Sequence, residues 1–431
     1  MNDGEVPEPR VLTRPEHCLS RKNIDPDALK VMVRLNRNGF KAFLVGGSVR
    51  DLLLGKQPKD FDVATDARPG QVKKLFRNCR IIGKRFRLAH IYFRNNKIIE
   101  VSTFRKRPPD TLPEDVPEPV PGKPGDNTFG APHEDALRRD LTINGLFYDL
   151  ETFSVVDYVG GVEDLRNRVV RTIGDPEERF REDPFRMIRS VRHAVQAGFR
   201  IEPATYDAIL ACAHLLRQSN PSRLHDDVQK DLDRGHFASV LRTQMETGIL
   251  AAYFPELETY LRTGGLPDSL FQPAWVWEAL ARLDEAGSGD PNSRRFRTAS
   301  LLLPLLEKRL LDAFGFPHNP VRNPKETHLY LIECSAPMGL QRSQREESKT
   351  LWVAWLRLRA YLSEGKLPIR FQNKPYFSDA CAWHIFHQSL AEGRSAVEVE
   401  ADIHQAVQTG RAVVKRKRRR RGRNRQPTPN P

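Results

Sequence analysis

In the N-terminal part of the chain, short apolar segments are separated by residues that typically begin or end a helix. An apolar run over 42–45 enters a glycine pair, and helical spacing follows over 49–54. Upstream, Asp25 and Pro26 form a helix start, because aspartate accepts hydrogen bonds from first-turn amides and proline lacks an amide that would be unpaired there. The pattern predicts a helix, a strand, a tight turn and a second helix, in that order.

Further along, short apolar segments predict strands over 90–93 and 97–102, joined by an asparagine turn. A helix over 69–76 is expected before them. This βα unit followed by a hairpin indicates a small α/β domain and not a doubly wound parallel sheet. From residue 162 onward the chain is expected to be mostly helical, with amphipathic segments such as 351–362.

A proline-rich segment separates these two regions. Seven prolines fall within residues 105–126. Proline removes a backbone donor, so such a segment cannot continue a helix or pair as an inner strand. We expect an exposed, mobile loop there.

Composition adds the expected partner and compartment. The chain has 431 residues, a formal net charge of +14 and a sequence pI of about 9.7, which favours a nucleic-acid partner. No apolar run approaches the length of a membrane helix, and the acidic N-terminus does not resemble a secretory signal. The five cysteines are far apart and form no Cys-x-x-Cys pair, so neither zinc nor disulfides are indicated. We expect a cytoplasmic protein without membrane association.

The basic charge is concentrated at the C-terminus. Nine lysines and arginines lie within residues 415–425, and removing them lowers the formal charge to 14 − 9 = +5. Like charges at this density predict a disordered segment that binds anions. A tail that only increases solubility is the alternative.

Candidate chemistry lies around the glycine pair. Gly46 and Gly47 let the backbone approach a phosphate closely, and the amides of the next helix favour an anion. Asp60 and Asp62 lie two apart on an expected strand, so their carboxylates point to the same side. Paired carboxylates beside a phosphate site suit Mg²⁺. The alternative is an ordinary Asp-x-Asp at a solvated strand end.

The string from Gly46 to Asp62, with Arg50 and Asp51 between them, resembles the catalytic core of class II nucleotidyltransferases. This polymerase β-like superfamily includes bacterial poly(A) polymerases and CCA-adding tRNA enzymes. The resemblance implies an α+β fold: an N-terminal nucleotidyltransferase palm with a small mixed sheet, a mostly helical neck and body, and a disordered basic tail. It also implies that Gly46, Gly47 and Arg50 contact the nucleotide.

The same resemblance divides the chain into five parts. A glycine pair at 160–161 resembles the family's hinge between palm and neck. The expected parts are an arm (1–24), the palm (25–161), a neck that recognises the base and RNA (162–265), a helical body (266–410) and the tail (411–431).

A second motif, beginning at Arg138, resembles the triphosphate-binding segment of the family. Arg139 offers a guanidinium group for phosphate oxygens, Asp140 a third carboxylate, and Asn144 an amide for ribose or base. Without the other motifs, this cluster would be an ordinary surface ion pair. Glu100 is a rival third carboxylate; the resemblance favours Asp140, while spacing alone does not choose between them.

The helix expected after Pro184 carries a further candidate site. Arg186, Arg189 and Arg192 recur every three residues and share a face, with Asp183 one turn below. The pattern resembles the family's Asp–Arg pair that selects the incoming base, formed here by Asp183 and Arg186, with Arg189 and Arg192 at nucleotide-contact positions. The alternative is a basic helix flank with a cap.

The segment 81–91 separates the two enzyme classes, because it closely resembles bacterial poly(A) polymerases. Within it, Arg85 and Arg87 could reach a primer or triphosphate. We therefore predict template-independent addition of AMP from ATP to RNA 3′ ends. The alternatives are a CCA-adding tRNA nucleotidyltransferase and an RNA-binding protein without activity, and the intact Asp60, Asp62 and Asp140 argue against the latter.

The predicted mechanism uses two Mg²⁺ ions, which Mn²⁺ could replace, held by Asp60 and Asp62. ATP is a substrate, and the partners are the 3′ ends of mRNA and other transcripts. We expect a monomer. RNA-degradation and RNA-chaperone proteins are conceivable partners, but no motif identifies one.

Overall fold

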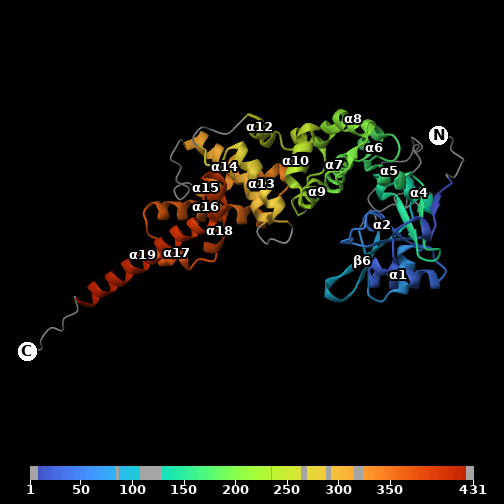
Figure 1. Cartoon of the computed structure of the whole chain (residues 1–431), viewed down its shortest axis with the longest axis horizontal. Coiled ribbons are helices and arrows are strands. Elements are labelled where there is room, and N and C mark those ends of the chain that lie inside the picture. The colour runs from blue at the N-terminus through green and yellow to red at the C-terminus, as the bar shows by residue number, and fades with distance from the viewer. Residues whose placement is uncertain are drawn as a thin grey trace, which may run out of the picture. The chain divides into compact units, whose positions relative to one another are not determined.

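The computed structural model describes residues 8–83, 87–106, 129–233, 235–263, 269–287, 293–314 and 324–423 (Figure 1). The chain forms two compact units, Met1–Cys212 and Ala213–Pro431. Most of the expected proline loop, and Arg85 of the segment 81–91, lie outside the described residues. The finer five-part division remains a prediction.

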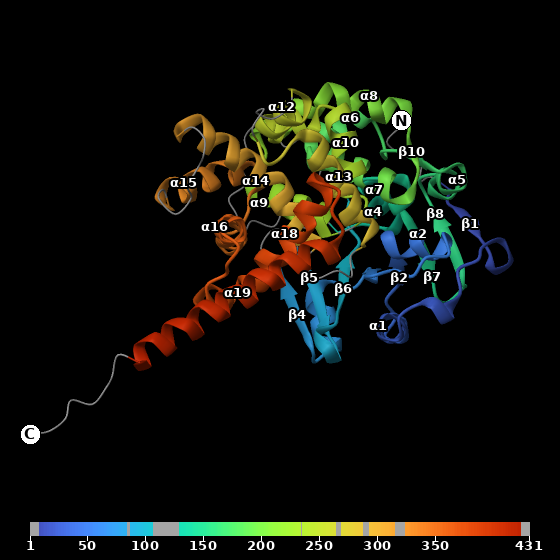
Figure 2. The same ribbon diagram turned by 60° about the vertical axis from the view of Figure 1, so that its left-hand side comes forward.

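The first unit is built on an eight-stranded mixed sheet with the order β1-β8-β7-β2-β3-β6-β5-β4. Its strands are β1 (Arg10–Leu12), β2 (Ala42–Val45), β3 (Asp62–Thr65), β4 (Cys79–Ile82), β5 (Leu88–Tyr92), β6 (Ile98–Thr103), β7 (Leu146–Asp149) and β8 (Ser154–Asp157). Only β3 and β6 pair in parallel; the other neighbours are antiparallel. Figure 2 shows β4 and β1 at opposite edges of the sheet.

Eight helices belong to this unit in the described residues. They are α1 (Pro26–Arg37), α2 (Gly47–Leu53), α3 (Pro69–Leu75), α4 (Pro132–Leu137), α5 (Gly161–Asn167), α6 (Pro176–Glu182), α7 (Phe185–Ala197) and α8 (Pro203–Cys212). Short 3-10 helices are η1 (Arg14–Glu16), η2 (Arg21–Asn23), η3 (Arg94–Asn96) and η5 (Thr142–Asn144). A separate parallel pair joins β9 (Val169–Val170) and β10 (Arg200–Ile201).

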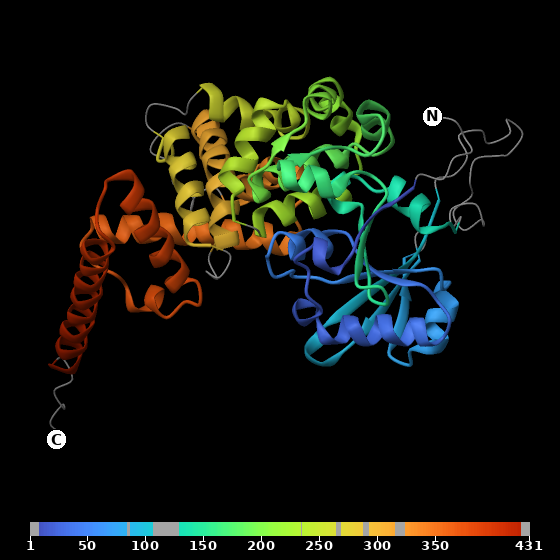
Figure 3. The same cartoon turned by 45° about the vertical axis from the view of Figure 1, so that its right-hand side comes forward.

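Helix α1 confirms the predicted start signal. The Asp25 carboxylate accepts hydrogen bonds from the amides of Asp27 (2.8 Å) and Ala28 (3.3 Å), and Pro26 is the first helical residue. The helix buries Val31 and Leu35 in the main core of the unit. Figure 3 shows this long blue helix lying across one face of the sheet.

The expected N-terminal arm contributes a strand. Strand β1 pairs antiparallel with β8, so that Arg10 lies opposite Asp157, and Leu12 is buried in the core. The sequence did not predict this strand, because three residues carry too little periodicity to define one and the partner lies far along the chain.

The two faces of the sheet are covered by different cores. Leu44, Val63 and Val101 point to the face that α1 and α3 cover. Val45, Ala64 and Phe147 belong to a smaller cluster with Ala136 of α4 on the other face. Because side chains alternate along a strand, Asp62 shares this second face with Ala64.

One glycine of the predicted hinge is required by close packing. A Cβ on Gly161 would lie 2.1 Å from the carbonyl oxygen of Thr142, so only glycine fits there. The Asp157 carboxylate accepts hydrogen bonds from the amides of Val159, Gly161 and Val162. These contacts fix the start of α5 against η5.

The second unit is helical throughout its described residues, as expected. Its helices are η6 (Ala213–Gln218), α9 (Pro221–Asp233), α10 (Phe237–Glu246), α11 (Ile249–Tyr253), α12 (Pro255–Thr263), α13 (Pro273–Glu285), α14 (Ser293–Phe314), α15 (Pro324–Ser335), η7 (Ala336–Met338), α16 (Arg342–Ser363), α17 (Ile369–Gln372), α18 (Phe377–Ala391) and α19 (Ala396–Arg423). Trp352, Trp355 and Trp383 are among its largest fully buried side chains. No helix among the described residues is long and apolar enough to cross a membrane.

Helix α19 runs from the helical body into the basic segment. Its backbone is helical through Arg423, and Figure 1 shows it extending beyond α17 and α18; residues 424–431 lie outside the described residues. Lysine and arginine are good helix formers, and a helix that has already started extends without a new nucleus.

Candidate active site

The two predicted catalytic carboxylates lie at the start of β3. Asp62 is the first residue of that strand and lies opposite Val45 of β2 and beside Glu100 of β6. Asp60 precedes the strand, whereas the sequence predicted that both aspartates lie within it. The strand begins later because Gly46 has φ 71° and turns the chain away after Val45, which removes the partner that Asp60 would need.

The pKa of Asp62 depends on burial and on the charged groups around its carboxylate. Its side chain is exposed at the start of the inner strand β3, yet the surrounding protein desolvates it and raises its pKa to about 6. The neighbouring carboxylates of Glu100 and Asp60 add to the rise, and Arg139 opposes it. The site therefore gathers negative charge that a cation would stabilise.

Arg139 is held in front of this face by a residue that the sequence analysis missed. Its Nε and Nη2 donate to Asp135 Oδ2 at 3.2 and 3.0 Å, and its guanidinium lies 5.2 Å from the centre of the Phe147 ring. Asp135 is buried and also accepts from Arg138. The i,i+4 spacing of Asp135 and Arg139 was the available signal.

The glycine pair lies directly beside Arg139. A Cβ on Gly46 would come within 3.2 Å of Arg139 Nη1, and one on Gly47 within 3.4 Å of Arg50 Nη2. Gly46 also has a left-handed backbone, so a larger residue there would be strained and would crowd the guanidinium. The predicted glycine turn is thus confirmed, and it brings the backbone close to two cations.

A polar network joins α2 to η5. Arg50 is nearly buried; its Nε donates to Asp51 Oδ1 at 2.9 Å and its Nη1 to Asn144 Oδ1 at 2.7 Å. The Asn144 amide in turn donates to Asp140 Oδ1 at 3.3 Å. Three residues predicted from separate motifs, Arg50, Asp140 and Asn144, therefore lie in one connected group.

Asp140 is held mainly by helix α7. Arg189 donates through Nε to Asp140 Oδ2 at 2.9 Å and through Nη2 to Asp183 Oδ2 at 3.3 Å. Desolvation disfavours the charged form of Asp140, but Arg189, His193 and the hydrogen bonds from Arg189 and Asn144 outweigh it and hold the pKa of Asp140 well below its usual range. His193 also contacts Arg50 Nη1 at 3.3 Å and was missed, since a lone histidine on a helix gives no signal.

The predicted Asp183–Arg186 pair has a different arrangement. Asp183 is joined to Arg189, whereas Arg186 donates to Glu182 Oε2 at 3.0 Å and to the Arg179 carbonyl at 3.2 Å. The prediction counted spacing within one helix and did not include α6, which supplies both acceptors. Arg192 is buried within α7, and Arg87 is exposed.

Comparisons with known proteins agree with this architecture. Residues 42–171 match the poly A polymerase head domain, and residues 198–261 match a model described as the probable RNA and SrmB-binding site of polymerase A. Poly(A) polymerase I of Escherichia coli O6:H1 is 48% identical over 417 residues, which cover 93% of this chain and 85% of that protein. The chain belongs to the poly(A) polymerase I family. The predicted enzyme class, a polynucleotide adenylyltransferase, is thereby confirmed.

The poly(A) polymerase I family is related to the CCA-adding enzymes, the predicted alternative. The CCA-adding enzyme of Geobacillus stearothermophilus is 37% identical over 263 residues, covering 60% of each chain. The crystal structure of the Bacillus stearothermophilus CCA-adding enzyme in complex with CTP has a TM-score of 0.57, 25% identity, and covers 89% of this chain and 82% of that one. The fold is therefore shared by both classes, while the sequence places this chain in the poly(A) polymerase I family.

The residues of this site fit a hard divalent cation such as Mg²⁺. Two carboxylates would be its protein ligands, and the substrate would supply the remaining ones. Among the described residues, no group of three or more His, Cys, Asp or Glu side chains is arranged to hold a metal. Desolvation and the nearby carboxylates of Glu100 and Asp60 nevertheless disfavour the charged form of Asp62, and Arg139 only partly offsets them, so a bound cation would stabilise its carboxylate. Mg²⁺ is commonly held by one or two carboxylates together with substrate phosphates, which is the donor set available here.

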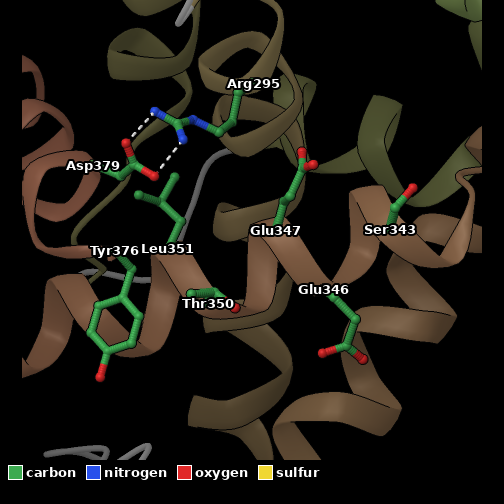
Figure 4. Close-up of a pocket in the computed structure, with 8 residues that line it drawn as sticks. All are labelled: Arg295, Ser343, Glu346, Glu347, Thr350, Leu351, Tyr376 and Asp379. Carbon is green, nitrogen blue, oxygen red and sulfur yellow. Dashed lines mark hydrogen bonds and ion pairs between the residues drawn. The ribbon is translucent and has the colours of Figure 1, made fainter. Parts of the chain in front are cut away.

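A pocket of about 240 Å³ in the second unit contains none of the predicted site residues. It lies between α14, α16 and α18, and its lining residues are Arg295, Ser343, Glu346, Glu347, Thr350, Leu351, Tyr376 and Asp379. Figure 4 shows the Arg295 guanidinium facing both carboxylate oxygens of Asp379, in an ion pair of 2.6 Å. Glu346 is near His328 at 3.5 Å and Lys349 at 3.6 Å. Since cations already face two of its three carboxylates, this pocket is not a second candidate for nucleotidyl transfer.

Proposed function

We propose that the palm transfers AMP from ATP to the 3′-hydroxyl of RNA, without a nucleic-acid template, at Asp60, Asp62 and Glu100. The observation that carries this proposal is the position of Asp62 beside Glu100 in the parallel strand pair, in front of Arg139. Carboxylates that repel one another opposite a guanidinium suit a cation and a triphosphate together.

In the proposed reaction, the RNA 3′-hydroxyl loses its proton to solvent and its oxygen forms a bond to the α-phosphorus of ATP. The bond between the α-phosphorus and the α–β bridging oxygen breaks, and pyrophosphate leaves. When bound, Mg²⁺ supplies Lewis-acid stabilisation of the negative charge on the reacting phosphate and the leaving group. Asp60 and Asp62 would hold it, with Mn²⁺ as a substitute. Arg139, clamped by Asp135, orients phosphate oxygens, and Gly46 and Gly47 allow the triphosphate to approach.

Glu100 replaces Asp140 in this proposal as the third carboxylate. Glu100 and Asp60 are the carboxylates that raise the pKa of Asp62, whereas Asp140 is occupied by Arg189 and Asn144. Asp140 then acts as a positioning residue that connects helix α7 to Asn144 and Arg50, which face the ribose and phosphates. The site with Asp140 as third carboxylate and the site with Glu100 in that place use the same candidate residues, but the role of Asp140 differs between them.

Adenine selection is proposed for the start of α7. Asp183 and Arg186 would present an acceptor and donors to the base edge, and each is held by another side chain, Arg189 or Glu182. Such support reduces the freedom lost on binding, which favours discrimination between bases. Arg189 and Arg192 complete the proposed nucleotide-binding face.

The test of this function is incorporation of labelled nucleotide by the purified full-length chain. With Mg²⁺ and an unrelated oligoribonucleotide, ATP should give long A tracts, and CTP, GTP and UTP should give little product. Asp62→Asn should abolish incorporation while Glu151→Gln, an exposed carboxylate of the β7–β8 turn, should not. CTP addition followed by arrest at CCA on tRNA would contradict the proposal.

The natural RNAs and the compartment also belong to the proposal. A site without a template suits diverse RNA 3′ ends, including mRNA. All five cysteines are unpaired, which supports a reducing compartment such as the cytoplasm.

A further inference from the structure

An unusual charge distribution marks one edge of the palm. Residues 67–99 contain no aspartate or glutamate and ten lysines or arginines. These are Arg68, Lys73, Lys74, Arg77, Arg80, Lys84, Arg85, Arg87, Arg94 and Lys97. The described part of the segment forms α3, β4, β5 and η3, and it places Arg77 and Arg80 at the β4 edge of the sheet. The proposed mechanism uses none of them.

A pocket of about 370 Å³ lies at this edge. Its lining residues are Arg77, Asn78, Cys79, Arg80 and Tyr92. The Arg80 guanidinium lies 5.5 Å from the centre of the Tyr92 ring, and the side chains of Arg77 and Arg80 are exposed. Within the described part of the chain, no carboxylate pairs with either arginine. Two uncompensated cations therefore flank an aromatic ring in a hollow.

The edge is continuous with the candidate active site. Arg80 lies opposite His90, His90 opposite Glu100, and Glu100 beside Asp62, so these residues form one row across four strands on the same face. Neighbouring strands lie about 4.8 Å apart, which places Arg80 roughly 14 Å from Asp62 along the sheet. This separation suits the last few nucleotides of a strand whose 3′ end is at Asp62.

We propose that Arg77, Asn78, Arg80 and Tyr92, here called the β4 edge, bind single-stranded RNA just upstream of the 3′ end. The inference rests on the proposed function for the direction of the strand. Arginines neutralise backbone phosphates, and an aromatic ring stacks on a base without sequence preference. An enzyme that extends diverse RNAs needs such a contact, because it must hold the primer without recognising a sequence.

The test compares two double variants that change the charge equally. Arg77→Gln/Arg80→Gln alters the β4 edge, and Arg10→Gln/Arg166→Gln removes two exposed arginines from β1, the opposite edge strand, and α5. Each lowers the formal charge from +14 to 14 − 2 = +12. Thermal unfolding followed by circular dichroism verifies that both variants are folded.

For the β4-edge variant, the KM for a primer of about 20 nucleotides should rise roughly tenfold, with kcat and the KM for ATP unchanged. The slope of log affinity against log salt should decrease by roughly 1.4, at about 0.7 for each lost phosphate contact on a single strand. A dinucleotide primer should show no such change in KM, since it is too short to reach the edge. Tyr92→Leu should weaken RNA binding several-fold without changing the slope.

Equal slopes for the two double variants would overturn the proposal, because the effect would then be one of net charge. Unchanged RNA binding with lost binding of polyglutamate would also overturn it and assign the edge to an acidic protein. Failure of the wild-type chain to add AMP would contradict the proposed function alone, since the comparison of RNA affinities does not depend on turnover.

Discussion

Asp62 of β3 and Glu100 of β6 occupy the same register position in the only parallel strand pair of the eight-stranded sheet. This register brings a third carboxylate next to the predicted pair without any contribution from the Arg139 motif. It also explains why spacing along the chain did not choose between Glu100 and Asp140. The choice depends on which strands are neighbours, and only the fold determines that.

Glu100→Gln should lower kcat by about a hundredfold or more while leaving the fold intact. Glutamine keeps the shape but removes a charge next to Asp62, and each tenfold loss corresponds to about 1.4 kcal/mol of transition-state stabilisation. The Glu100 side chain is half exposed, so the melting temperature should not change. Single-turnover AMP incorporation at saturating ATP measures the effect, and near-normal turnover would return the role of third carboxylate to Asp140.

Activity at limiting Mg²⁺ should fall as the pH drops through about 6, where Asp62 becomes protonated and no longer holds a cation. Higher Mg²⁺ should move the midpoint to lower pH, because the cation competes with the proton. The pKa of Asp62 is raised in the fold, so the free energy of unfolding without metal should decrease as pH rises from about 4 to 6. A Mg²⁺-independent midpoint would contradict this assignment.

Features that depend on residues adjacent in the chain were predicted correctly, whereas strand limits and side-chain partners that depend on distant segments were not. The cap at Asp25, the turn at Gly46 and the helix at α3 depend on residues adjacent in the chain, and all are observed. The start of β3 and the partner of Arg186 depend on other segments, Gly46 after β2 and Glu182 of α6. A spacing rule within one helix cannot include an acceptor from the helix before it, so the contacts of α7 required the structure.

Asp140→Asn should destabilise the palm by roughly 1–3 kcal/mol at neutral pH, since Arg189 would lose a charged acceptor in a mostly buried network. The pKa of Asp140 is lowered in the fold, so its stabilising contribution is present above the ordinary value near 4 and is lost as the pH falls. The difference in melting temperature between wild type and variant should therefore shrink in acid. Glu151→Gln, at an exposed position of the β7–β8 turn, serves as a control for carboxylate removal. A difference that is constant with pH would contradict the ion-pair account.

Base selection is expected to depend on both Asp183 and Arg186. Removing either should leave a polar group unmatched against adenine, at a cost of roughly 1–3 kcal/mol in the preference for ATP over CTP and GTP. Arg181→Ala, an exposed arginine paired with Glu177 on α6, is the matched control. The measurement is kcat/KM for each of the four nucleotides. If the kcat/KM ratios among the nucleotides stayed unchanged in Arg186→Ala but changed in Arg189→Ala, base selection would be assigned to Arg189, which contacts Asp183.

The basic C-terminal run is expected to strengthen RNA binding without taking part in catalysis. Truncation after Val414 removes nine lysines and arginines but keeps Val399, Ile403 and Ala406, which α19 buries in its core. The shortened chain should therefore keep its melting temperature. Its RNA affinity should fall, and the salt slope should decrease by up to about 6, at roughly 0.7 for each neutralised phosphate.

Truncation after Arg425 is the matched control, because it removes six uncharged residues and keeps every cation of the run. AMP addition at saturating primer should stay nearly normal in both shortened chains, since every proposed catalytic group precedes residue 199. RNA affinity at several salt concentrations, measured for the three lengths, separates the contributions. If the slope were the same after removal of nine cations, the tail would serve only solubility, and the β4 edge with the remaining palm would carry the salt dependence.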